Sequence, residues 1–298
     1  MQNILELLEG FVDMHIHAGP SLMAREVDAW DMAREAVKGK FAAIVIKDHH
    51  IPTIGATRII QDHLENTNLR VFGSLALNNS VGGLNPRAAE AAIGFGAKVV
   101  WMPTVSSRNH IEMHRVYAKK YPFPAVEKKL TIPEEPIVCI DSNGNLTPDA
   151  ENVLQVITKY PDVVLATGHG NRAEINAIVR RAVSIGIKRI MVDHPHFMVE
   201  ATFEDIKTWR SLGAYIEFTA VTSVPASKFY CLPASQIADL IKALGPERFI
   251  LSSDYGQLGN GSPVDGMCAF IELLLGEGVE IGSIIQILRE NPSNLLGL

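Results

Sequence analysis

The sequence predicts an α/β protein with the fold of a (β/α)8 TIM barrel. Short runs of apolar and β-branched residues recur along the 298-residue chain, and each is followed by a longer stretch of helical periodicity. This alternation is typical of parallel strands joined by crossover helices. Eight such runs are present, and eight is the number of strands that closes this type of barrel.

Each predicted strand is a short run rich in apolar and β-branched residues that contains or ends close to a polar side chain. A parallel strand is buried on both faces, so its sequence is nearly continuously apolar. In chain order the strands are expected at FVDMHIH (11–17), AAIVIK (42–47), RVFGSLAL (70–77), KVVWMPT (98–104), VVLATGH (163–169), RIMVDHP (189–195), AYIEFTA (214–220) and FILSSD (249–254).

The boundaries of the intervening helices are also marked. Asn85-Pro86 and Thr147-Pro148 place a capping side chain before a proline at the first helical position, and Thr202 precedes a helix in the same way. Glycines are expected to end the helices, because glycine adopts the left-handed conformation of a C-terminal cap at little cost. They are Gly39, Gly96, Gly186, Gly213, Gly245 and Gly278.

One connection is much longer than barrel loops usually are. It follows the fourth predicted strand and covers approximately residues 105–147. Asn143-Gly144 lies there between alternating residues, which is the pattern of a tight hairpin turn. We therefore expect residues 1–298 to form one barrel domain that carries a small β-hairpin lid as an insertion after strand four.

Composition excludes several classes of protein. The formal net charge of −6 is distributed along the chain, and no Lys/Arg-rich block is available for nucleic acid. No apolar run approaches the roughly 20 residues of a membrane span. The N-terminal apolar run is too short for a signal peptide and contains Glu6 and Glu9. Three distant cysteines predict neither a disulfide framework nor a thiolate metal site, so a soluble, cytoplasmic protein is expected.

Two histidines lie at the end of the first predicted strand. His15 and His17 occur in DMHIH, and alternate residues of a strand point to the same face. Neutral imidazole is a preferred ligand of Zn²⁺ and of similar divalent ions. The pair alone fits a metal site and a structural role about equally well.

Other polar residues at strand ends favour the metal site. His169, His194 and Asp254 end the fifth, sixth and eighth predicted strands, at the rim where barrel enzymes carry their active sites. Seven of the ten histidines lie at such strand ends: His15, His17, His49, His50, His169, His194 and His196.

This set resembles the metal residues of the amidohydrolase superfamily, over the whole chain and in the same order. The ending ENPSNLLGL (290–298) is also similar to an ending in that superfamily, where the last helix packs below the barrel. The resemblance implies one or two divalent ions, first of all Zn²⁺ with Mn²⁺ or Fe²⁺ as alternatives, bound by His15, His17, His169, His194 and Asp254. It further implies hydrolysis of an amide, lactone or ester-like bond through metal-activated water, with Asp254 as the catalytic proton shuttle.

The chain departs from that superfamily at strand four. Two-metal members carry a carboxylated lysine or a glutamate there, whereas this strand ends with Trp101, Met102 and Thr104. Lys47 in IKDHH is the candidate replacement, as a carboxylated, metal-bridging lysine. An ordinary ion pair of Lys47 with Asp48 or Asp254 explains the residue equally well.

Substrate contacts are expected from His49, His50, His196 and Asn78 beside the metal residues. Glu217 and Thr219 are expected to line the pocket or to orient ligands from behind. His110 and His114 are four residues apart, as on one helix face, and a solvated helix is favoured over a second metal site. Arg108 or Arg115 on that helix could hold a substrate carboxylate.

Alternative functions remain open from the sequence. IKDHH and the His-x-His pair also resemble the polymerase-and-histidinol-phosphatase-like phosphoesterases, in which His49 or His50 would bind metal. A metal-assisted decarboxylase or hydratase, or a sensor without activity, is compatible with the same barrel. In each case the expected partner is a small molecule, and self-association into a homo-oligomer is left open.

Overall fold

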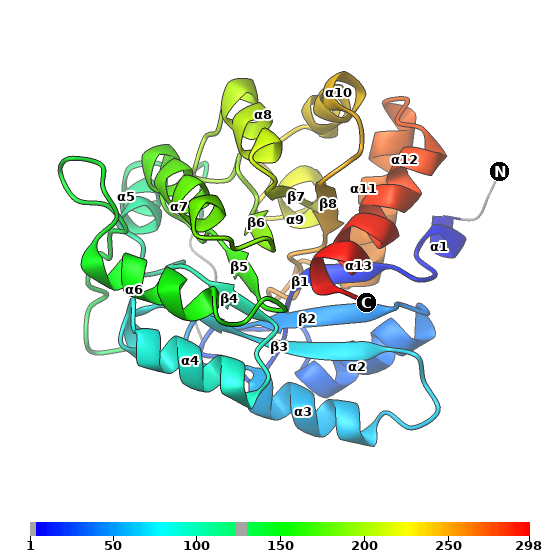
Figure 1. The fold of residues 1–298 in the computed structure, drawn as a ribbon. Coiled ribbons are helices and arrows are strands. Elements are labelled where there is room, and N and C mark those ends of the chain that lie inside the picture. The colour runs from blue at the N-terminus through cyan, green and yellow to red at the C-terminus, as the bar shows by residue number, and fades with distance from the viewer. Residues whose placement is uncertain (1–3, 123–129) are drawn as a thin grey trace.

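Eight parallel strands pair in chain order in the computed structural model, which describes residues 4–122 and 130–298 (Figure 1). Each strand lies within its predicted run, so the predicted fold class is confirmed. Three strands of the middle of the sheet are only three residues long, and the rest of their predicted runs forms loops. The strands are β1 (Val12–His17), β2 (Ala43–Lys47), β3 (Arg70–Ala76), β4 (Val99–Trp101), β5 (Val164–Ala166), β6 (Ile190–Val192), β7 (Tyr215–Thr219) and β8 (Phe249–Ser252).

The barrel closes where β8 meets β1. The backbone N–H of Asp254 donates to the carbonyl oxygen of His15 at 2.7 Å, and the N–H of His17 donates to the carbonyl oxygen of Tyr255 at 2.9 Å. These bonds hold the segment after β8 directly beside the end of β1. Two regions that are about 240 residues apart in the chain are thereby fixed at one rim.

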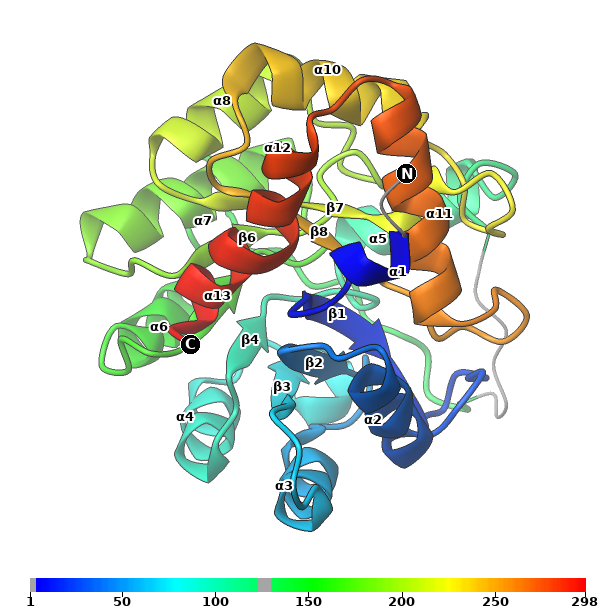
Figure 2. The same cartoon turned by 90° about the vertical axis from the view of Figure 1, so that its right-hand side faces the viewer.

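Helices surround the strands as an outer layer (Figure 2). None of those within residues 4–122 and 130–298 is long and apolar enough to cross a membrane. The helices are α1 (Ile4–Leu7), α2 (Ala29–Lys38), α3 (Ile54–His63), α4 (Pro86–Phe95), α5 (Arg108–Val116), α6 (Pro148–Ile157), α7 (Arg172–Ser184), α8 (Phe203–Ser211), α9 (Ala220–Ser223), α10 (Ala234–Leu244), α11 (Pro263–Gly276), α12 (Ile281–Ile285) and α13 (Asn291–Leu296), with a 3₁₀ turn at Asn79–Val81 and a π-helical turn at Gln286–Glu290.

The predicted helix starts are capped as expected. The side chain of Asn85 accepts from the backbone N–H groups of Arg87 and Ala88, and Thr147 accepts from that of Ala150. Thr202 forms a reciprocal capping box with the side chain three residues later. Each bond satisfies a backbone donor that has no partner within its helix.

Five of the six glycines predicted to end helices have the positive φ angle of a left-handed cap, although Gly245 has a ψ of 164° and lies outside that conformation. Gly96, Gly186, Gly213, Gly245 and Gly278 have positive φ angles. Gly39 was wrongly expected to do so: its φ is −75°, and Lys40 takes the left-handed conformation instead, with φ 53°. Glycine is still required at 39, because a Cβ there would lie 2.8 Å from a ring carbon of Phe41.

The end of the barrel where the strands begin is closed by α13. Leu295 and Leu296 are buried in the same apolar cluster as Val12 at the start of β1. The Asn291 side chain donates to the carbonyl oxygens of Pro246 and Phe249, at 2.8 Å each, and so ties α13 to the start of β8. The ENPSNLLGL ending therefore packs below the barrel, as the sequence resemblance implied.

The predicted β-hairpin lid is not present in the described part of the insertion. Residues 130–147 contain no strand. One isolated antiparallel bridge, Ile140–Leu146, crosses the turn at Gly144, with backbone bonds from the N–H of Asp141 to Asn145 at 2.8 Å and from the N–H of Thr147 to Cys139 at 2.9 Å. The Asp141 carboxylate explains this, because it accepts from the backbone N–H groups of Asn143 and Asn145, which are then unavailable to a hairpin ladder. The remaining residues of the insertion, 123–129, lie outside the described residues.

Candidate metal centre

Two imidazoles at the end of β1 are held by their Nδ1 atoms. His17 Nδ1 lies 3.0 Å from the carbonyl oxygen of Lys47, which can only accept, so Nδ1 carries the proton. Lys47 Nζ lies 3.0 Å from His15 Nε2, which makes that nitrogen the acceptor. His15 Nδ1 then donates to Glu217 Oε2 at 3.1 Å. In both rings Nε2 is then an acceptor: that of His15 accepts from Lys47, and that of His17 keeps the lone pair that a metal ligand requires.

Asp254 meets both of these lone pairs. Its Oδ1 lies 3.2 Å from His15 Nε2 and 3.1 Å from His17 Nε2. Three acceptor atoms at such separations repel one another unless a cation or a proton lies between them. Two ligands of one Zn²⁺ ion, each at roughly 2.0–2.1 Å, are themselves separated by roughly 3.0–3.4 Å. Each of these two nitrogen–oxygen pairs therefore has the spacing of two ligands of one divalent ion, and the three residues whose ligand atoms all lie within 4.8 Å of one another here are His15, His194 and Asp254.

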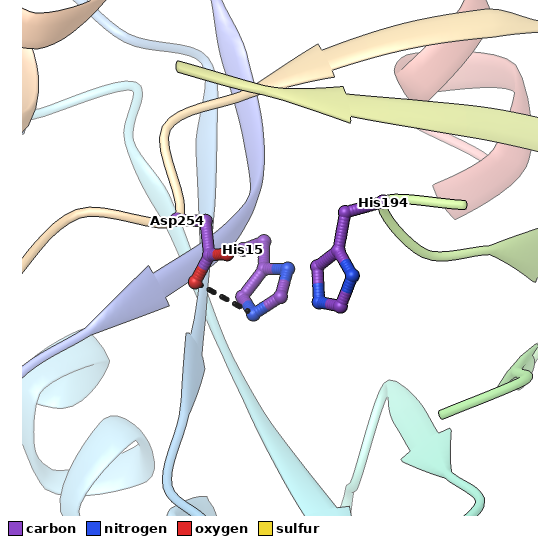
Figure 3. A group of neighbouring side chains, drawn as sticks. All are labelled: His15, His194 and Asp254. Atoms are coloured by element: carbon purple, nitrogen blue, oxygen red, sulfur yellow. Dashed lines mark ion pairs between the residues drawn. The ribbon is translucent and has the colours of Figure 1, made fainter. Parts of the chain in front are cut away.

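A second group lies beside the first. His194 faces His15, with 5.7 Å between the ring centroids (Figure 3), and its ring lies 4.9 Å from that of His169. His169, Asp193 and His194 bring one ligand atom each within 4.8 Å of the others, and so do His15, His194 and Asp254. His169 Nε2, Asp193 Oδ2 and His194 Nδ1 are buried without a hydrogen-bond partner in the described structure. Such atoms are costly to bury unless an ion or a proton satisfies them.

Asp193 was not identified from the sequence. It is fully buried, and its Oδ1 accepts from the backbone N–H of Gly168 at 2.9 Å. Its place directly before His194 at the end of β6 was the available signal. It was missed because an aspartate inside an apolar strand run could equally point away from the barrel interior.

Lys47 lies between the two groups. Its Nζ is 4.0 Å from the centre of the ring of Trp101, the last residue of β4. Within the described structure no ion pair joins Lys47 to Asp48 or Asp254; it donates to His15 instead, and Asp48 lies 3.7 Å from Arg25. Burial lowers the pKa of the Lys47 ammonium, since the charged form is the costly one in an apolar interior.

Burial also shifts the titration of the other residues of the centre. It raises the pKa of Asp254 to about 7, against an ordinary value of 3.8. It lowers the pKa of His194 to about 3, and it lowers the pKa values of His15, His17 and His169 well below 6.5. The imidazoles are therefore neutral at physiological pH and ready to bind a cation, whereas Asp254 readily holds a proton when no cation neutralises it.

The backbone is strained at two of these residues. His194 and Asp254 have φ angles of 26° and 52°, in a region that non-glycine residues rarely adopt. Gly256 follows in the same loop with φ 120°, and a Cβ there would lie 1.7 Å from the carbonyl oxygen of His17. Only glycine permits this approach, which brings the loop after β8 against the end of β1.

A cavity of about 500 Å³, including its open mouth, lies over the centre. Its wall includes His15, His17, Lys47, His49, His169, His194 and Asp254, together with Arg25 and the apolar side chains Met23, Val105, Phe197, Val221 and Phe229. Residues at or after the carboxyl ends of seven strands, β1, β2 and β4 to β8, thus line one pocket. This is the arrangement expected of a site at the carboxyl end of a barrel.

The four residues expected to contact substrate occupy different places. His49 lines the cavity, whereas His50, His196 and Asn78 do not. Asn78 acts from behind: its Nδ2 donates to Thr104 Oγ1 at 2.7 Å and to the carbonyl oxygen of His49 at 2.8 Å. His49 Nδ1 lies 2.9 Å from the same hydroxyl, so Asn78 positions His49. His196 stacks on Phe218, with 5.7 Å between ring centroids.

The expectation of a solvated α5 is wrong. His110 and His114 are 4% and 2% exposed and line the cavity, and His110 Nδ1 lies 2.8 Å from His169 Nδ1. The spacing of the two histidines predicts a shared helix face, but not whether that face is covered. Arg108 and Arg115 are exposed and do not line the cavity, so the arginine beside the centre is Arg25, from the loop after β1.

Solved structures with the same fold include enzymes of the amidohydrolase superfamily. An amidohydrolase from Pseudomonas aeruginosa superposes with a TM-score of 0.61 at 11% identity, over 99% of this chain and 98% of that chain. An amidohydrolase from Mycoplasma synoviae gives 0.56 at 16% identity, over 99% and 89%. A 2,6-dihydroxybenzoate decarboxylase gives 0.53 at 13% identity, over 97% and 99%. The predicted resemblance to this superfamily is confirmed for the fold.

Comparison by sequence gives one assignment. No curated protein matches the chain. The model of a family of unknown function, DUF6282, matches residues 10–217, which is more than half of the chain. The matched region runs from the start of β1 into β7 and contains the histidines of the candidate centre together with Lys47, Asp193 and Glu217. The chain belongs to this family, DUF6282.

Proposed function

We propose that the protein is a metal-dependent hydrolase that cleaves an amide, lactone or ester-like bond of a small molecule. One observation carries the proposal. The Nε2 lone pairs of His15 and His17 meet Asp254 Oδ1 at 3.1–3.2 Å, at the floor of a cavity. Neutral imidazoles and a carboxylate in this arrangement are the ligands of catalytic zinc sites, which keep an open position for water.

The chain's own residues would divide the work. His15, His194 and Asp254 would hold one ion, with His17 against the same carboxylate oxygen, and His169 and Asp193 would form a second group beside His194. Zn²⁺ suits these donors best, with Mn²⁺ and Fe²⁺ as alternatives. Such an ion lowers the pKa of bound water to about 7 and polarises a carbonyl group. Asp254 lies against both His15 and His17 in the cavity wall, where it would accept a proton from the attacking water and return it to the leaving group.

Lys47 is the proposed bridge between the two groups. Its Nζ lies 3.0 Å from His15 Nε2, and Lys47 lines the same cavity as His169 and His194. Carboxylation of Nζ would replace this cation by an anion with two oxygen donors. ¹³C NMR of metal-loaded protein in ¹³C-bicarbonate should show a carbamate signal that is lost in Lys47→Met. Without such a signal, Lys47 is an ordinary buried ammonium hydrogen-bonded to His15.

A metal-assisted decarboxylase is the second candidate. The decarboxylase named above shares the fold over almost the whole of both chains. Strand four also supplies Trp101 where a bridging carboxylate would stand, which favours a single ion if Lys47 is unmodified. Product analysis separates the candidates, because decarboxylation releases CO₂ and consumes no water.

The decisive experiment combines metal analysis with a substrate panel. Protein purified without added metal should contain at least one equivalent of a divalent ion, and it should hydrolyse a lactone, an amide or an ester. Turnover of phosphoesters alone would favour the phosphoesterase alternative. Stoichiometric metal without turnover of any class would favour a sensor. Protein that binds no divalent ion would contradict the proposal.

A further inference from the structure

Arg25 is a buried cation in the wall of the cavity. It lies in the loop between β1 and α2, and its side chain is 4% exposed. The nearest groups to its guanidinium are the sulfur of Met23 at 3.8 Å and Asp48 Oδ2 at 3.7 Å. Within the described structure the guanidinium has no oxygen acceptor at hydrogen-bond distance, and Nε is buried without any partner.

Arg25 differs in this respect from an arginine whose guanidinium is hydrogen-bonded to a carboxylate. A guanidinium carries five N–H donors in a planar fork, and burying them without acceptors is costly. Arg181 shows the satisfied case, because its Nε donates to Glu151 Oε2 at 2.8 Å and its Nη2 donates to Glu151 Oε1 at 2.5 Å. Asp48 forms an ion pair with Arg25 through Oδ2, but at 3.7 Å this oxygen accepts no hydrogen bond from the guanidinium, and Oδ1 accepts from the backbone N–H groups of His50 and Ile51.

The guanidinium is close to the candidate metal centre. Arg25 lines the same cavity as His17, His49 and Asp254. The backbone of Arg25 pairs with that of Gln257, whose Nε2 donates to the carbonyl oxygen of Asp254 at 2.7 Å. Apolar side chains, Val105, Phe197, Val221 and Phe229, form other parts of the same wall. The cavity wall thus combines the candidate metal centre, the Arg25 guanidinium with unused N–H donors, and an apolar surface.

We propose that the substrate carries a carboxylate that Arg25 binds, joined through an apolar body to the bond that reacts at the metal centre. The proposal rests on the hydrolase function given above and names its substrate class. A planar carboxylate matches the two parallel N–H donors of a guanidinium. A monoanion fits better than a phosphate dianion, because Asp48 and Asp254 already place negative charge nearby.

Calorimetric binding to the metal-loaded protein tests this, with phenylacetate, phenylacetamide and phenyl phosphate as probes. Phenylacetate should bind more tightly than the other two. Arg25→Gln should weaken phenylacetate binding at least tenfold and leave phenylacetamide unchanged. Arg108→Gln, which alters an exposed arginine outside the cavity, is the matched control and should change neither. Binding requires no turnover, so this result is independent of whether any bond is hydrolysed.

Several outcomes would overturn the assignment. Equal phenylacetate binding in Arg25→Gln would mean that the metal alone holds the carboxylate, and tighter binding of phenyl phosphate would replace the carboxylate by a phosphate. If Arg25→Gln fails to fold, the double variant Arg25→Gln/Asp48→Asn removes both charges together. Phenylacetate binding by that double variant at the strength of the unaltered protein would show that Arg25 only neutralises Asp48.

Discussion

The two ends of the barrel are built from opposite kinds of residue. Where the strands end, buried imidazoles and carboxylates face one another with shifted pKa values, and His194 and Asp254 adopt strained backbone conformations. Where the strands begin, Leu295 and Leu296 of α13 pack on apolar residues, and Asn291 satisfies two carbonyl oxygens. The first end loses folding free energy through burial of polar groups, and the second end gains it through apolar packing.

This contrast indicates a division of labour. Strain and buried polar atoms persist only where the surrounding structure holds them in place. Strand β1 connects the two ends directly. Val12 at its start belongs to the apolar cluster that contains Leu295 and Leu296, and His15 and His17 at its end belong to the candidate metal centre. Substitutions where the strands begin should therefore lower the stability of the fold, whereas substitutions where the strands end should lower metal binding and turnover.

The largest effect is expected from Asp254→Asn. The substitution keeps the size of the side chain but removes the group that accepts and returns a proton, so kcat should fall about 10²- to 10⁴-fold. The protein should remain folded, because the neutral amide avoids the cost of a buried charge. Asp239→Asn, at an exposed position of α10, is the control. An unchanged kcat in metal-loaded Asp254→Asn would disprove the role in proton transfer.

At the opposite end, Leu296→Ala should act on stability alone. Leu296 is fully buried, and removal of such a side chain costs about 2–5 kcal/mol. Denaturant unfolding measures the loss, while metal affinity at neutral pH should stay the same. Leu298→Ala, at a position that is 45% exposed, should change little. A loss of metal affinity without a loss of stability would mean that the two ends are not separable.

Glu217→Gln is expected to lower metal affinity by an intermediate amount. Glu217 accepts from His15 Nδ1, and residues that orient metal-bound histidines typically contribute about 10- to 100-fold to metal affinity. Competition with a chromogenic chelator measures this affinity in the variant. The exposed Glu272→Gln serves as the control. Equal affinity in both variants would show that Glu217 does not support the ligand.

The smallest effect is the pH dependence of metal binding. Without metal, burial raises the pKa of Asp254 from 3.8 to about 7, so an incoming ion must displace a proton below pH 7. Affinity should rise by at most about tenfold per pH unit from pH 5 to 7 and then level off. The histidines contribute no slope in this window, because burial keeps them neutral. In Asp254→Asn the slope should disappear, and a persisting slope would point to another group.

Much of the fold and part of the site could be predicted from the sequence. Apolar runs define the strands locally, and polar residues at the ends of parallel strands must meet at one rim, so His15, His17, His169, His194 and Asp254 could be grouped before any coordinates. Asp193 could not be assigned, because a strand run does not state which way a buried aspartate points.

The positions of residues from the loops could not be predicted from the sequence. The burial of His110 and His114, the approach of Arg25 to Asp48 and the missing hairpin around Asp141 each depend on where a connection packs against the rest of the chain. Strand patterns and strand-end ligands are local properties of the sequence, repeated eight times, and the barrel follows from them. Contacts between distant segments determine the depth of the cavity, the position of Arg25 in its wall and the tautomers of its histidines. Only the tertiary structure decides these contacts.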